Sequence, residues 1–116
     1  MNLTLNLAYL NEISDGDNAF IQSILQTFLE EAPKDIAKLK EAIDIKDEKT
    51  VGALAHKNKA TLQLLGLVEL KEMAFQIEQK AKEQSVNTTE LIANAKLFAQ
   101  HLDTTLPVIE QAMTAL

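Results

Sequence analysis

His56 is the side chain of this protein that is best suited to chemistry, and Lys59 follows it three residues later. A histidine is a competent nucleophile near neutral pH and can attack an activated phosphoryl group, such as an acyl phosphate, without an activating base. Residues three apart on a helix share a face, so the ammonium of Lys59 can offset the charge of a phosphoryl group. No base, nucleophile and orienting group converge elsewhere in the sequence. The residue types therefore permit a phosphoryl carrier rather than an enzyme with its own kinase activity.

The helix that carries His56 turns this side chain away from the core. Its core-facing positions recur at helical spacing: Val51, Leu54, Ala55, Asn58, Leu62 and Leu65. Asn58 lies in the middle of that stripe. At about 100° per residue, His56 points about 160° away from Asn58 and so away from the core. The outward face is shared by four further residues: Gly52, Lys59, Ala60 and Gln63. The same spacing places Asn58 in the core, where its amide needs hydrogen-bond partners.

Other interpretations of the chemistry-bearing residues remain open at this point. On spacing alone, a solvent-facing histidine with a lysine one turn later is more often an ordinary surface residue. The other histidine, His101, has no histidine or cysteine partner at ligand spacing, and we expect it at the surface or the core boundary. A calcium loop near Asp15 is disfavoured, because Phe20 and Gln26 stand where glycine and a bidentate glutamate are required. We therefore expect no metal site and no cofactor.

Length and composition limit the classes of protein further. A chain of 116 residues suits one core, so we expect a single domain over residues 1–116. The net charge is −6 and all 11 basic residues are lysines, which disfavours nucleic-acid binding. The sequence contains no cysteine, no basic leader and no apolar run near the roughly 20 residues that a membrane helix needs. We expect a cytoplasmic monomer without a membrane partner.

Hydrophobic spacing predicts one short helix followed by four long ones. Leu7 and Leu10 indicate the opening helix, which should end near residues 14–16. Asp17 is a good N-cap for the next helix, in which Pro33 should cause a kink or a restart. Its apolar stripe consists of nine residues: Phe20, Ile21, Ile24, Leu25, Phe28, Leu29, Ile36, Leu39 and Ile43.

The remaining helices have equally clear boundaries. The third should begin near residues 47–50 and end at Gly66, and the fourth should carry the apolar positions between residues 67 and 81. Asn87 and Glu90 resemble a capping box that opens the last helix, with a kink expected at Pro107. Because no strand pattern competes, the sequence predicts an all-α fold, an antiparallel four-helix bundle with a short additional N-terminal helix.

The segment over residues 55–67 resembles the signature of the histidine-containing phosphotransfer (HPt) family. In that signature the histidine follows an alanine. Counted from the histidine, an apolar residue stands at the second position, lysine at the third and glycine at the fourth; small residues follow, and a second glycine stands at the tenth. His56, Lys59 and Gly66 match it. The runs at residues 16–20 and 28–33 are similar to the family's long second helix, proline included. The next helix is matched by Leu70, Met73, Ile77 and Glu78.

This resemblance, which covers roughly residues 5–113, implies a bundle that carries a phosphoryl group on His56 in a two-component phosphorelay. It implies that Lys59 stabilises the phosphoryl group, and that receiver domains of response regulators or hybrid sensor histidine kinases are the partners. The implied docking residues around the histidine are Gly52, Lys57, Ala60 and Gln63. The initiating methionine favours a free-standing unit.

The sequence departs from the family's signature at several positions. Ala60 replaces its glycine, which allows the receiver to approach closely, and Asn58 replaces an apolar residue. Thr61 and Leu62 replace small residues. These departures leave open a second interpretation, a non-catalytic helical bundle that docks a receiver-like partner without phosphotransfer.

Overall fold

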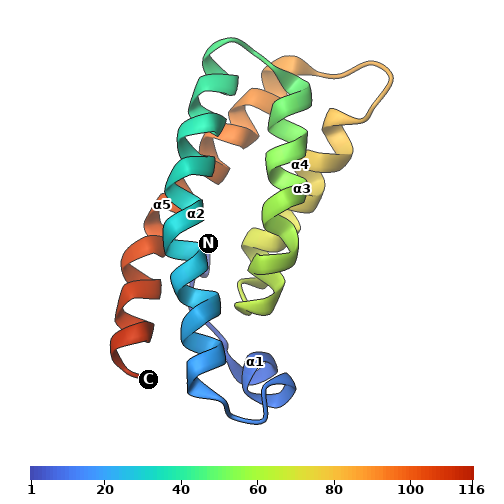
Figure 1. Cartoon of the computed structure of the whole chain (residues 1–116). Helices are drawn as coiled ribbons and strands as arrows, with labels where there is room; N and C mark the ends of the chain where they lie inside the picture. Colours follow the sequence, from blue (N-terminus) through green and yellow to red (C-terminus); the bar gives the residue numbers. More distant parts are fainter.

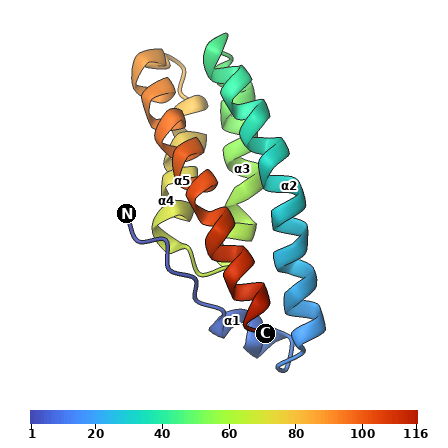
Figure 2. The same ribbon diagram turned by 90° about the vertical axis from the view of Figure 1, so that its left-hand side faces the viewer.

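The computed structural model describes all residues from 1 to 116 and contains five helices and no strand. A short α1 (Ala8–Ile13) precedes four long helices: α2 (Asn18–Asp44), α3 (Glu48–Leu64), α4 (Val68–Ala81) and α5 (Thr88–Thr114). The long helices stand side by side in an elongated bundle of 45 × 22 × 21 Å, and α1 lies across one end (Figures 1 and 2). The predicted all-α four-helix bundle with an additional N-terminal helix is confirmed.

Three side chains cap the long helices where the sequence predicted helix starts. Asp17 accepts hydrogen bonds from the backbone amides of Ala19 and Phe20, and Asp47 accepts one from Thr50. Asn87 accepts one from the amide of Glu90. The reciprocal half of the expected capping box is absent, because the Glu90 carboxylate instead binds Lys80 Nζ. This ion pair joins the end of α4 to the beginning of α5.

The core runs the length of the bundle, and all five helices contribute to it. The most extensive packing is between α3 and α4 and between α2 and α5. Burial of these apolar faces is the main force that holds the four helices together. None of the helices combines the length and the apolar character that crossing a membrane would require.

The structure of α2 departs from the sequence-based expectations at two positions. Of the kink or restart expected at Pro33, the restart is absent, because α2 is one element from Asn18 to Asp44, and the kink stays a prediction. Proline removes one backbone hydrogen bond, but buried Ala32 and Ile36 on either side anchor the helix to the core. Phe20 is not a core residue, since it is 42% exposed while its neighbour Ile21 is fully buried. Neighbouring residues point about 100° apart on a helix, and here Ile21 points into the core while Phe20 is turned toward solvent.

Gly66 ends the segment that carries the predicted site, and its conformation explains why glycine stands there. Its φ of +72° lies in the left-handed region, which side chains with a Cβ rarely adopt. A Cβ at this position would also lie 2.4 Å from the carbonyl oxygen of Asn6. The N-terminal segment therefore crosses directly over the α3–α4 turn, where the Asn6 amide donates to the Leu65 carbonyl.

Candidate functional site

His56 stands on the outer surface of α3, with its side chain 68% exposed. The core-facing residues before and after it on α3, Val51, Ala55 and Leu62, are fully buried. The same helix therefore anchors itself in the bundle and presents the imidazole to solvent, as the helical spacing predicted. Ala60 and Gln63 are exposed on this face as well.

Glu78 is the residue that sequence reasoning missed as a member of the site. It lies on α4, is only 3% exposed, and accepts three hydrogen bonds with its two carboxylate oxygens. Oε1 receives His56 Nδ1 at 2.8 Å and Lys82 Nζ at 3.1 Å, and Oε2 receives Lys59 Nζ at 2.8 Å. A signal was present in the sequence, because Glu78 lies four residues after buried Ala74 and so at core-facing spacing. A charged residue at such a position requires partners.

The partners of Glu78 keep it ionised. The hydrogen bond from Lys59 has the largest effect and, with those from Lys82 and His56, lowers the pKa of Glu78 from 4.5 to about 2, although burial acts in the opposite direction. An ionised carboxylate can only accept hydrogen bonds, so the proton between the two groups belongs to Nδ1 of the imidazole. The contact therefore selects the tautomer in which Nδ1 carries hydrogen and Nε2 keeps its lone pair.

Lys59 lies beside His56 but is held on the inner side of the site. Its side chain is 26% exposed, its Nζ binds Glu78, and the same atom lies 5.4 Å from the centre of the Phe75 ring. A cation over an aromatic face at this distance is attracted to the ring. Two contacts thus restrain Lys59, and one carboxylate group separates its ammonium from the imidazole.

Lys57 and Asn58 contact the opposite neighbour, α2, through buried Asp35. Lys57 Nζ lies 2.8 Å from one Asp35 oxygen and 3.7 Å from Glu31, and the hydrogen bond that it donates to Asp35 raises the pKa of Lys57. Asn58 donates to the other Asp35 oxygen at 3.2 Å and to the Leu54 carbonyl at 2.9 Å. The buried amide that the sequence left without partners is therefore satisfied.

Gly52 does not belong to the exposed face on which the sequence placed it, because it is buried between α3 and α4. A Cβ at Gly52 would lie only 2.7 Å from the Cβ of Ala81 on α4. Helical periodicity gives the direction of a residue but does not reveal how near a neighbouring helix comes. Gly52 is a close-packing residue that brings α4 against the helix of His56.

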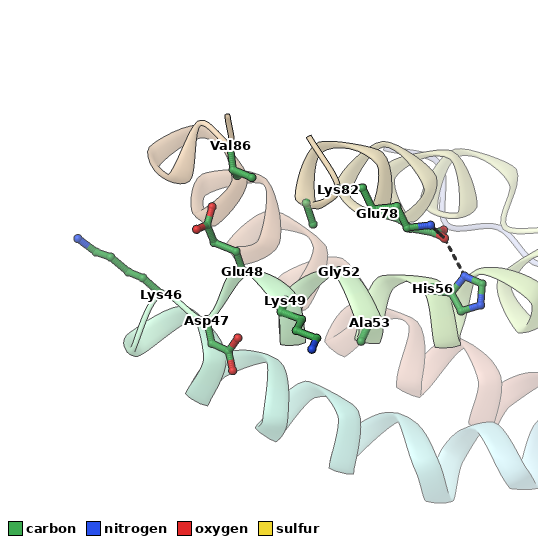
Figure 3. A pocket seen from close by; sticks show the side chains of 11 residues that line it. Lys46, Asp47, Glu48, Lys49, Gly52, Ala53, His56, Glu78, Lys82 and Val86 are labelled. Carbon is green, nitrogen blue, oxygen red and sulfur yellow. Dashed lines mark hydrogen bonds and ion pairs between the residues drawn. The ribbon is translucent and has the colours of Figure 1, made fainter. Parts of the chain in front are cut away.

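A groove of about 670 Å³ adjoins His56 on the side that faces the α4–α5 connection. Its lining includes small residues, Gly52, Ala53 and Ala81, and His56, Glu78 and Lys82 stand together at one end. Figure 3 shows the imidazole and the carboxylate pointing toward one another at that end. Within the whole chain, no group of three or more His, Cys, Asp or Glu side chains could hold a metal ion. His101, the second histidine, is half-buried on α5.

Comparisons with known proteins give a family match and two solved structures of the same fold. Residues 23–116 match the family model described as Hpt domain, which is more than half of the chain. The crystal structure of the HPT domain from a sensor hybrid histidine kinase of Shewanella superposes with a TM-score of 0.84 at 18% identity, covering 98% of this chain and 97% of that one.

A second solved structure, histidine-containing phosphotransfer protein B (HptB) from Pseudomonas aeruginosa PAO1, superposes with a TM-score of 0.78 at 16% identity. This superposition covers 97% of this chain and 96% of that protein's chain. No curated protein sequence matches the chain. At these identities the two structures show that the fold is shared.

Proposed function

The chain belongs to the Hpt domain family and is a phosphorelay intermediate in two-component signalling, and from this premise we propose that His56 is the residue that carries the phosphoryl group. The observation that supports this assignment most strongly is the contact of Nδ1 with the Glu78 carboxylate at 2.8 Å. It leaves the Nε2 lone pair free on a side chain that is 68% exposed. The other histidine has no comparable partner among the hydrogen bonds of the protein.

The proposed transfer needs little from this chain beyond a well-placed imidazole. The Nε2 lone pair of His56 attacks the phosphorus of an aspartyl phosphate on a receiver domain, and the N–P bond forms as the P–O bond to the aspartate breaks. The aspartate leaves as a carboxylate. The Nδ1 proton stays on the ring and remains shared with Glu78, which offsets the positive charge that develops on the imidazole. Transfer to the next receiver reverses these steps.

Lys59 is proposed to stabilise the phosphoryl group, and its contact with Glu78 gives it a second role. As the strongest influence on the carboxylate, Lys59 keeps Glu78 ionised and hence keeps the proton on Nδ1. The positive charge of Lys59 also lowers the cost of placing a phosphoryl group, with about −1.5 to −2 charges, beside a buried carboxylate. Both effects favour a phosphorylated His56.

Hpt domains interact with receiver domains, and we propose that the receiver docks over the exposed residues around His56. These residues are Lys57, Ala60 and Gln63, which come from the outward part of α3. Gly52 is not part of this proposal, because it is buried against α4. Compared with the glycine of the family's signature, Ala60 adds one methyl group to the surface that the receiver must approach closely.

We propose that residues 1–116 form a single Hpt domain that acts as a cytoplasmic monomer. It would carry phosphate without autonomous kinase activity, and it would bind neither nucleic acid nor membrane. The net charge of −6, with no arginine, supports the absence of nucleic-acid binding.

The proposal is tested with a panel of purified receiver domains that have been phosphorylated by acetyl phosphate. Wild-type protein should acquire an acid-labile phosphoryl group from at least one of them, and His56→Gln should acquire none. His101→Gln is the matched control, because it removes the only other imidazole and should be labelled like the wild type. Equal labelling of His56→Gln and the wild type would show that the site assignment is wrong.

A further inference from the structure

Lys82 is bound to the same oxygen of Glu78 as the proposed phosphoacceptor. His56 Nδ1 lies 2.8 Å and Lys82 Nζ lies 3.1 Å from Oε1 of Glu78. One atom thus separates the ammonium of Lys82 from the imidazole ring. Lys59 occupies the other oxygen, Oε2, on the inner side of the site.

The two lysines on Glu78 differ in how firmly they are held. Lys59 is 26% exposed and is restrained both by Glu78 and by the ring of Phe75. Lys82 is 66% exposed, caps the C-terminal end of α4, and has Glu78 as its only ion-pair partner. An exposed lysine side chain changes rotamer on a picosecond to nanosecond timescale. Lys82 can therefore leave Glu78, whereas Lys59 is confined.

Departure of Lys82 would not leave the buried carboxylate without partners. Glu78 would keep the hydrogen bonds from Lys59 and from Nδ1 of His56, one on each oxygen. The effect of Lys59 on the pKa of Glu78 is also larger than that of Lys82. Glu78 therefore stays ionised and keeps the imidazole in place when the outer lysine moves.

Open space connects Lys82 to the exposed side of His56. Both residues line the same groove, whose lining also includes the small side chains of Ala53 and Ala81. Gly52 brings α3 close enough to α4 for this arrangement, since a Cβ there would collide with Ala81. In Figure 3 the only labelled side chain between Lys82 and the imidazole is that of Glu78, whose carboxylate binds both.

We propose that Lys82 is a second phosphoryl-binding cation, which moves from Glu78 to an oxygen of the phosphoryl group when His56 is phosphorylated. The phosphoryl group brings about −1.5 to −2 charges and strong acceptor oxygens to a position in solvent, where an exposed ammonium reaches it without being buried. The two cations then have different partners. Lys59 neutralises Glu78 from the inside, and Lys82 neutralises the phosphoryl group from the outside.

This inference rests on the assignment of His56 as the phosphoacceptor, and potassium phosphoramidate tests the two separately. This small donor passes its phosphoryl group to histidine with release of ammonia, so no receiver is needed. The phosphorylated protein is freed of donor, and the loss of the phosphohistidine signal is followed by ³¹P NMR. The variants are Lys82→Met, Lys82→Arg and Lys49→Met. Lys49 lines the same groove, forms no ion pair, and is the matched control for the loss of one charge.

Lys82→Met should shorten the lifetime of the phosphohistidine about fivefold, since a charge-assisted hydrogen bond to the phosphoryl group is lost. Lys82→Arg and Lys49→Met should retain the wild-type lifetime. A lifetime of Lys82→Met equal to that of Lys49→Met would overturn the proposal, as would an equal loss in Lys82→Met and Lys82→Arg. If the wild type is not labelled, or if His56→Gln is labelled as strongly, the assignment of His56 has failed instead.

Discussion

His56 Nδ1 lies 2.8 Å from Oε1 of Glu78, so a buried carboxylate on α4 orients an exposed imidazole on α3. The carboxylate is ionised and can only accept a hydrogen bond, which assigns the ring proton to Nδ1. The nitrogen that remains nucleophilic is therefore the one farther from Glu78. This relationship joins two helices and determines which atom of His56 is available for reaction.

Replacement of Glu78 should change the tautomer of His56. Glu78→Ala removes the acceptor of Nδ1, so both tautomers of the free imidazole become populated. Phosphorylation at Nε2 should slow about tenfold, the size of effect typical when a histidine loses the partner that fixes its tautomer and orientation. Glu78→Gln keeps an acceptor oxygen and should retain more of the activity. The tautomer is measured from the ¹⁵N chemical shifts of the imidazole. A wild-type tautomer ratio in Glu78→Ala would contradict the account.

Acidification should remove the stability that Glu78 provides. Its pKa is about 2 in the folded protein and 4.5 without the folded environment. Because the folded pKa is depressed, the unfolded chain binds the proton more readily, and the contribution is full above pH 4.5 and is lost as the pH falls toward 2.

The measurement is urea unfolding of the wild type and of Glu78→Gln across this range. The difference in unfolding free energy should shrink as the pH falls. The two ends of the range, about pH 5 and about pH 2.5, span most of the interval between the unfolded and the folded pKa of Glu78. A difference in unfolding free energy that stays constant over this range would rule out the assignment of the depressed pKa to this residue.

A methyl group at Gly52 should push α3 and α4 apart. Gly52→Ala gains about 1 kcal/mol of helix propensity, but overpacking of a close contact costs about 1–3 kcal/mol. Because the new Cβ would lie 2.7 Å from that of Ala81, and neither methyl can rotate away, we expect a net loss of stability.

The double variant Gly52→Ala/Ala81→Gly tests the cause of that loss. It removes the opposing methyl group, so the cost of the Gly52 substitution should be smaller in the Ala81→Gly background than in the wild type. Thermal unfolding of the four proteins measures this coupling. Additive effects would mean that contact with Ala81 is not the reason for glycine at position 52.

The amide of Asn58 should contribute more to the stability of the fold than an apolar side chain of similar size would. Asn58→Leu would leave Asp35, whose side chain is 3% exposed, with Lys57 as its only remaining partner, at a cost of about 1–3 kcal/mol. Gln63→Leu on the exposed face of the same helix is the matched control and should change stability little. An increase in stability for Asn58→Leu would show that the amide has no structural role here.

Local features of the fold could be predicted from the sequence, because they depend on neighbouring residues. The caps Asp17, Asp47 and Asn87 mark the beginnings of three helices, and each needs only a side-chain oxygen two or three residues before the amide that it accepts. The outward direction of His56 likewise follows from the periodicity of one helix.

Features that depend on the distance between helices could not be predicted. The sequence placed Gly52 on the exposed face, because the spacing within α3 contains no information about Ala81 on α4. Glu78 and Lys82 lie 22 and 26 residues after His56, and only the packing of α4 against α3 brings them to the imidazole. The partner of Asn58 was missed for the same reason, since Asp35 belongs to α2.

The most direct test of the account is ³¹P and ¹⁵N NMR of the protein after phosphorylation by an acetyl phosphate-loaded receiver domain. We expect one phosphorus nucleus coupled to Nε2 of His56, with the proton retained on Nδ1. Phosphorus coupled to Nδ1, or phosphorus that persists in His56→Gln, would contradict it.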